Sequence, residues 1–159
     1  MSESSFAVAD VGEFQVETPP YDITIGMSPE TMGELRPDLN GFRVKVPGLN
    51  GIYLIHEGRR RLIPNPETYN NLFRDWEGIL EGSWVKLILE GSPIANGAVL
   101  ARGIGTSGVY LIDLYVKRGV ASPETMERYH FNWDRVYPVP VILLDNIPSG
   151  TLIRWPQVS

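Results

Sequence analysis

The chain has 159 residues and an apolar content of 43%, so it is long enough to bury a hydrophobic core, and wholesale disorder is excluded. Its net charge of −5 at pH 7 argues against a nucleic-acid partner, because the phosphate backbone repels an acidic surface. The absence of cysteine removes disulfides, thiol catalysis and cysteine-based zinc sites.

The first residues of the chain have neither a positively charged region nor an adequate apolar stretch, so we expect no secretory signal. Residues 1–12 are expected to form a flexible N-terminal arm. No apolar run approaches the roughly 18 residues that a membrane-spanning helix needs, so no membrane span is expected. These features suit a cytoplasmic protein or one released by a non-classical route, and they leave the compartment open.

Residues 13–50 resemble a degenerate first copy of a repeat. Residues 28–31 read Ser-Pro-Glu-Thr, a helix-starting sequence that returns at 122–125, and Pro37 should end this helix. We also expect a strand at 14–16 or 23–25. It would pair with a C-terminal strand at 152–155 and so close the domain.

The clearest pattern in the chain is a stretch of 26 residues that recurs without a gap 57 positions later. Residues 51–76 and 108–133 are identical at nine positions, which include Gly-x-Tyr-Leu-Ile, Pro-Glu-Thr and a final Trp. Each copy is expected to be one supersecondary unit that needs its neighbours to form a core. The chain is therefore predicted to form a single repeat domain, 13–159, with units near 13–50, 51–107 and 108–159.

Each of the two clear copies begins with a β-prone run that predicts a hairpin. Residues 52–55 are followed by a short loop containing Gly58, which can adopt the positive φ of a tight turn, and then by 60–63. The second copy has Leu114 and Tyr115 at this turn, so a wider hairpin or one bent strand is expected there. Tyr53 and Tyr110, inside the strands, are expected in the core.

A short helix should follow each hairpin. Residues 65–68 read Asn-Pro-Glu-Thr and residues 122–125 read Ser-Pro-Glu-Thr. Asn or Ser is a favoured N-cap, Pro66 and Pro123 suit the first helical position, and Glu complements the positive end of the helix dipole. An apolar stripe at helical spacing ends at Trp76 in one copy and at Trp133 in the other. Both indoles are therefore expected to anchor their helix in the core.

The stretches 84–89, 98–101, 139–144 and 151–155 are rich in β-forming residues and are expected to be strands. Together with the hairpins, they predict a compact α+β fold dominated by β structure. The fold should be pseudo-threefold, built of β-hairpins and short strands with three short proline-started helices.

The order of Gly-x-Tyr-Leu-Ile, Arg, Pro-Glu-Thr and a helix that ends in Trp resembles short tandem repeats of uncharacterised, mostly bacterial proteins. In those repeats a hairpin precedes a proline-started helix and a Phe-x-Trp sequence, which residues 131–133 match. The resemblance implies a repeat domain that is often part of a secreted or surface-associated protein. It implies no particular activity.

Aromatic side chains are the first candidates for ligand binding. As an alternative to the core, Trp76 and Trp133 could form platforms that stack on sugar rings, since an indole combines a large apolar face with a polar edge. Trp84 and Trp155 lie outside the repeated register. An exposed indole at either position would point to a ligand site.

Charged side chains are the second group of candidates. A guanidinium at Arg59, Arg61 or Arg118 could hold a carboxylate or phosphate with two hydrogen bonds. Alternatively, the arginines pair with Glu67 or Glu124, or they are simply solvated. An acidic residue at a turn, such as Asp113, could bind a ligand through its oxygen atoms, although turn formation also explains it.

No catalytic residue, cofactor or metal site is predicted. His56 and His130 occupy different places in the repeat, so they share no expected geometry. Residues 103–108 spell Gly-x-Gly-x-x-Gly, but a strand rather than a helix should follow, which favours a connecting loop over a dinucleotide site.

These features predict a non-enzymatic binding module with a glycan as its first expected ligand, because repeated weak sites add avidity. A second hypothesis is a structural or protein-interaction domain, accessory to a toxin or a surface assembly, whose partner is another protein. A third is a hydrolase with dispersed carboxylates. The sequence leaves the oligomeric state open.

Overall fold

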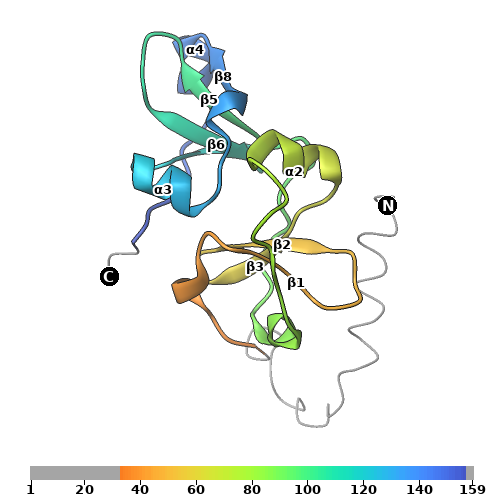
Figure 1. The fold of residues 1–159 in the computed structure, drawn as a ribbon. Coiled ribbons are helices and arrows are strands. Elements are labelled where there is room, and N and C mark those ends of the chain that lie inside the picture. The colour runs from red at the N-terminus through yellow and green to blue at the C-terminus, as the bar shows by residue number, and fades with distance from the viewer. Residues whose placement is uncertain (1–32, 157–159) are drawn as a thin grey trace. The chain divides into compact units, whose positions relative to one another are not determined.

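A computed structural model describes residues 33–156 of the chain (Figure 1). The predicted arm at 1–12, the helix predicted near residue 28 and the strands predicted at 14–16 and 23–25 lie outside the described residues. Within 33–156, no helix is both long enough and apolar enough to cross a membrane.

The chain divides into two compact units, and each combines segments that are separated in the sequence. The first unit contains Met1–Asn65 and Glu77–Pro93, and the second contains Pro66–Trp76 and Ile94–Ser159. The predicted repeat units, near 13–50, 51–107 and 108–159, are each contiguous in the sequence and so differ from these two units. The helix that begins at Pro66 thus belongs to a different unit from the hairpin that precedes it.

The first unit is built on a four-stranded mixed sheet. The strand order is β3 (Arg59–Leu62), β2 (Ile52–His56), β1 (Arg43–Lys45) and β4 (Leu80–Glu81). Only β1 and β4 are parallel within this sheet. Among the described residues this unit also contains the 3-10 helices η3 (Pro37–Leu39) and η4 (Ser83–Leu87). The buried core consists of Val44, Val46, Leu49, Tyr53, Ile55, Val85 and Ile88.

The second unit is built on another four-stranded mixed sheet. The strand order is β7 (Val116–Gly119), β6 (Val109–Asp113), β5 (Val99–Gly103) and β8 (Val136–Val139). Its helices are α2 (Pro66–Leu72), α3 (Pro123–Arg128), η5 (Trp133–Arg135) and α4 (Val141–Asp145). Aromatic and aliphatic side chains from α2, α3 and the sheet are buried here, among them Tyr69, Leu72, Phe73, Leu100, Leu111, Met126, Tyr129 and Phe131.

The two sheets have the same strand order and the same strand orientations. β5 and β8 are parallel, as β1 and β4 are, and all other neighbours are antiparallel. Strands β2 and β6 begin at Ile52 and Val109, and helices α2 and α3 begin at Pro66 and Pro123, in each case 57 residues apart. The predicted α+β class and its β-dominated character are confirmed.

The Pro-Glu-Thr sequences start helices as the capping pattern predicts. Ser122 accepts a hydrogen bond from the Thr125 backbone N–H at 3.1 Å. Both threonines are fully buried: Thr68 accepts from the Gly97 N–H, and Thr125 from the Trp155 N–H, each at 3.0 Å. Each threonine therefore ties the first turn of its helix to a distant segment of the same unit.

Three of the predicted strands are not strands in the structure. Residues 84–89 fall mostly in the 3-10 helix η4, and residues 139–144 fall mostly in α4. Of 151–155, only Ile153 makes a bridge, to Val120. Short apolar runs fit a helix or a strand equally well by periodicity, and local packing decided between them here.

The turn at Leu114 and Tyr115 is tighter than predicted. It joins β6 to β7 through two residues, as Glu57 and Gly58 join β2 to β3. The φ angles of Leu114 and Tyr115 are 53° and 68°, in the left-handed region that bulky residues rarely adopt. A two-residue hairpin turn of type I′ has positive φ at both positions, so the hairpin geometry overrides the residue preference.

Candidate functional site

The two tryptophans that end the repeated segments are exposed at the surface of the second unit. Trp76 exposes 43% of its surface and Trp133 exposes 46%, so the prediction that they anchor the helices in the core is wrong. The reason is helix length. Helix α2 ends at Leu72 and α3 ends at Arg128, so neither tryptophan continues the helical stripe.

The remaining residues of the predicted repeat core differ in burial. Tyr53 is buried in the core of the first unit, whereas Tyr110 is only half-buried. Pro66 is half-buried and Pro123 is exposed, and both stand at the start of a helix as predicted. Their fixed φ is useful at the start of a helix and requires no burial.

The segments that follow α2 and α3 lie side by side. Phe73 and Phe131 form an antiparallel bridge and are both buried, with ring centroids 5.7 Å apart. On either side of this bridge, the Asn132 N–H donates to the Leu72 carbonyl at 2.8 Å, and the Arg74 N–H donates to the His130 carbonyl at 3.0 Å. The bridge therefore brings the residues after one helix next to those after the other.

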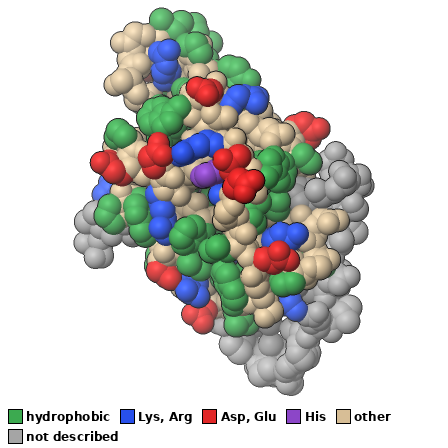
Figure 2. Space-filling view, viewed as in Figure 1, with side chains coloured by type: hydrophobic (Ala, Val, Ile, Leu, Met, Phe, Trp, Pro, Cys, Tyr) green, Lys and Arg blue, Asp and Glu red, His purple; other side chains and the backbone are tan. Residues whose placement is uncertain are grey.

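Charged side chains from the two segments pair across this bridge. His130 Nε2 lies 2.7 Å from Asp75 Oδ1, and Arg74 Nη2 lies 3.0 Å from Glu127 Oε1. Figure 2 shows a histidine at the surface with acidic and basic side chains around it. His130 has a φ of 60°, so its backbone is held in a left-handed conformation at this point.

Each exposed indole is oriented by a polar side chain six residues before it. Trp76 Nε1 donates to Asn70 Oδ1 at 3.0 Å, and Trp133 Nε1 donates to Glu127 Oε2 at 3.1 Å. The Trp133 indole and then the Arg74 guanidinium hold the pKa of Glu127 below its ordinary value. This spacing of six residues is visible in the sequence and could have identified the pairs.

Trp76 also has one face covered. Its ring stacks on the buried Tyr69, with centroids 3.9 Å apart and planes 23° apart. The exposed fraction of Trp76 must therefore come from its other face and its edge. We call Arg74, Asp75, Trp76, Glu127, His130 and Trp133 together the tryptophan surface.

The two tryptophans predicted from their position outside the repeat are engaged within their own units. Trp84 is half-buried, packs against the core of the first unit, and lies directly against the backbone of Gly82. Trp155 is half-buried, and its ring lies under the Arg128 guanidinium at 3.6 Å. Both indoles are thus less exposed than Trp76 and Trp133.

The arginines predicted as ligand residues make hydrogen bonds inside their units. Arg61 is buried, and its guanidinium donates to the Ser92 carbonyl at 2.7 Å and lies 3.2 Å from His56 Nδ1. Arg59 reaches the Glu90 carbonyl at 3.4 Å, and Arg118 bonds to the Thr151 hydroxyl. These contacts hold the arginines within their own units, Arg61 in the first and Arg118 in the second.

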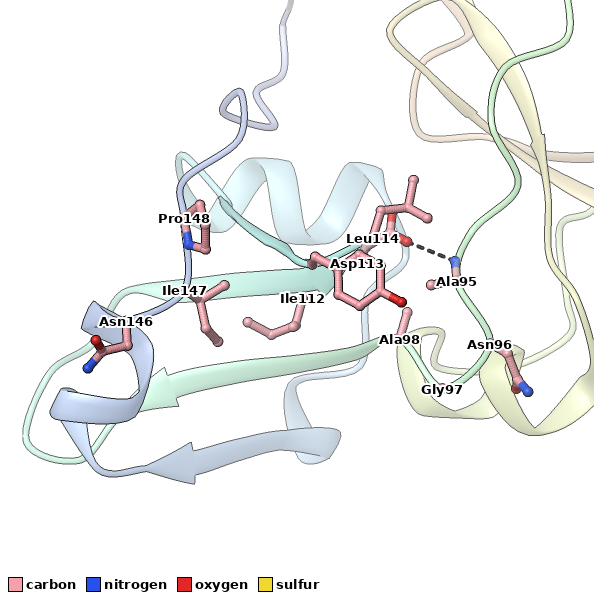
Figure 3. A pocket seen from close by; sticks show the side chains of 11 residues that line it. Ala95, Asn96, Gly97, Ala98, Ile112, Asp113, Leu114, Asn146, Ile147 and Pro148 are labelled. Atoms are coloured by element: carbon pink, nitrogen blue, oxygen red, sulfur yellow. Dashed lines mark hydrogen bonds between the residues drawn. The ribbon is translucent and has the colours of Figure 1, made fainter.

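Asp113 lines a hollow in the second unit, at the tip of the β6–β7 hairpin (Figure 3). Its carboxylate is buried, and Oδ1 accepts the Ala95 backbone N–H at 2.8 Å. The hollow has a volume of about 440 Å³ and lies between the hairpin tip, residues 95–98 and residues 146–148. It is the second place where side chains from separated segments surround a surface that a ligand could reach.

Within residues 33–156, no group of three or more His, Cys, Asp or Glu side chains is arranged to hold a metal ion. No protein-family model, curated protein or solved structure matches this chain.

Proposed function

We propose that this protein is a carbohydrate-binding module and that the tryptophan surface is its binding site. The observation that supports this most directly is the pair of half-exposed indoles whose ring nitrogens are already hydrogen-bonded. An oriented ring loses little conformational freedom on binding, and that preorganisation favours affinity.

The chemistry of the surface suits a sugar. A pyranose ring presents C–H bonds on one face and hydroxyl groups around its edge. The free face of Trp76 offers a flat apolar platform for the C–H face, since Tyr69 supports it from behind. The side chains of Asp75, His130 and Arg74 stand next to it and can accept from, or donate to, hydroxyl groups.

The hydrogen-bonded pairs of this surface also suit a neutral ligand. Asp75 is hydrogen-bonded to His130, and Arg74 is paired with Glu127. A carboxylate can accept several hydrogen bonds and a guanidinium can donate five, so these groups can bond to a sugar hydroxyl in addition to their present partners. A sugar hydroxyl brings no further charge to the surface.

The test is a titration of the full chain with soluble oligosaccharides by isothermal calorimetry. Trp76→Ala and Trp133→Ala should each weaken binding about fivefold or more, because a lost aromatic stacking partner costs about 1 kcal/mol or more. Tyr137→Ala is the matched control, since Tyr137 is an aromatic residue of the same unit that is 47% exposed on β8.

Two results would contradict the proposal. One is that no β-linked glucan, galactan or chitin oligomer binds at millimolar concentration. The other is that a saccharide binds equally well to the wild type and to both tryptophan variants.

A protein partner is the second candidate, and a different surface favours it. Helix α4 exposes Ile142 at 67% and Leu143 at 56%, and Ile104, which follows β5, exposes 59%. Adjacent apolar side chains of this kind are common at protein interfaces. Native mass spectrometry of the wild type should then show a defined oligomer or a retained partner, and Ile142→Glu should show neither. If the wild type and Ile142→Glu are both monomers, this candidate is rejected.

A further inference from the structure

The hollow at the β6–β7 hairpin tip carries an inference independent of the proposed carbohydrate site. The corresponding tip in the first unit is covered by its own chain. There Gly58 is buried, its carbonyl accepts the Arg36 N–H at 2.8 Å, and its N–H donates to Asn40 Oδ1 at 2.8 Å. A Cβ at Gly58 would lie 3.3 Å from Leu35 and Pro37, which is tighter than an ordinary contact, and the φ of 76° also favours glycine at this position.

The second unit has Tyr115 at the position of Gly58, and its tip is open. Tyr115 exposes 90% of its surface and Leu114 exposes 39%. A tyrosine side chain cannot fit under a covering segment of the kind that lies on Gly58. With Tyr115 in place of a glycine, the tip of the second unit is exposed, and a tyrosine borders the hollow.

The residues of this tip also have a backbone conformation that glycine would adopt more easily. Leu114 and Tyr115 both have positive φ, where bulky residues are disfavoured and glycine is not. Strained residues of this kind cluster at ligand sites, because another role of the side chain offsets the strain. Here the two strained side chains both line the hollow.

The lining determines which ligand would fit. Ile112 and Ile147 come from different segments and lie near each other along the hollow in Figure 3, and Pro148 extends this apolar wall. Asp113 is the one acidic residue among the eleven that line the hollow, and its Oδ1 already accepts a hydrogen bond from the Ala95 N–H. Asn96 and Asn146 also belong to the lining, and the Asn146 amide donates to the Ile142 carbonyl at 2.8 Å.

We propose that this hollow binds a small uncharged ligand with an apolar ring, held between Tyr115 and the wall formed by Ile112, Ile147 and Pro148. The volume of about 440 Å³ is within the range of small-molecule sites. An anion is disfavoured because the lining contains a carboxyl group and no basic side chain.

The experiment follows the amide NMR spectrum of the full chain during titration with phenol and, separately, with methyl β-glucoside. Phenol should shift the resonances of residues 95–98, 112–115 and 146–148. In Tyr115→Gly the affinity for phenol should fall about tenfold or more, while the unfolding temperature stays the same or rises, since the strain is relieved.

Glu57→Gly is the matched control, because it relieves a positive φ of 55° at the other hairpin tip and leaves the hollow intact. Ile147→Trp is the second variant: it fills the hollow from the opposite wall without changing the hairpin, and it should also abolish the phenol shifts. Trp76→Ala should leave phenol binding unchanged, so failure here and failure of the carbohydrate proposal are separate results.

Three outcomes would overturn the proposal. They are no phenol shift at millimolar concentration, shifts that persist unchanged in Tyr115→Gly and Ile147→Trp, and shifts of these residues by the glucoside but not by phenol. The last would assign the hollow to carbohydrate.

Discussion

The tips of the β2–β3 and β6–β7 hairpins have similar positive φ angles, but Gly58 in the first tip is buried and the second tip is exposed. Glu57 and Gly58 turn the first hairpin under a covering segment, whereas Leu114 and Tyr115 turn the second in the open. The strand order around them is identical. The comparison teaches that two similar units can keep their framework while one side chain decides whether a tip is closed by the chain or left accessible.

The largest effect on stability is expected when the tip of the first hairpin is given the tyrosine of the second. Gly58→Tyr should lower the free energy of unfolding by about 3 kcal/mol or more, because it adds left-handed strain and overpacks the cover. Urea denaturation measures this. Gly48→Ala is the matched control: Gly48 also has positive φ, 84°, but a Cβ there meets nothing within 4 Å. Equal losses in the two variants would show that the cover is not tight.

The reverse exchange in the second unit should have a smaller effect of opposite sign. Tyr115→Gly should raise the free energy of unfolding by about 0.5–1 kcal/mol, because the left-handed backbone then costs less and an exposed ring buries little. The same denaturation series measures it. A clear loss of stability would mean that the Tyr115 ring packs more than its exposure suggests, and the strain argument would fail.

The smallest effect concerns the partners of the two indoles, where the copies also differ. Asn70 bonds Trp76 and cannot titrate, whereas Glu127 bonds Trp133 and has a lowered pKa. Trp133→Phe should therefore raise the pKa of Glu127 toward its ordinary value, as carbonyl-detected NMR titration would show.

The sign of the stability effect follows from the same shift. Because the pKa of Glu127 is lower in the folded chain, its contribution is present above the unfolded pKa and is lost as pH falls through the folded one. Wild type and Glu127→Gln should thus differ in pH dependence only in the acidic range below the ordinary pKa of a glutamate. A difference that first develops near neutral pH would contradict this assignment.

Part of the candidate sites could be anticipated from the sequence. Asp113 was predicted as a ligand residue and does line the hollow. Trp76 and Trp133 were paired correctly by register, but they were assigned to the core because helical spacing was extended past the ends of α2 and α3. A hydrophobic pattern shows which residues share a face of a helix, and it does not show where the helix ends.

The sequence by itself determined the elements whose causes are local. The hairpins and the helices that begin at Pro66 and Pro123 follow from β-forming runs, turn residues and capping residues that lie within a few positions of one another. The α+β class follows from these elements.

Only the tertiary structure decided which residues are covered. It joined α2 to the second unit, covered Gly58 with residues 35–37 and left Tyr115, Trp76 and Trp133 exposed. The physical reason is that burial depends on contacts between residues far apart in the chain, and such contacts leave no pattern in the neighbouring sequence.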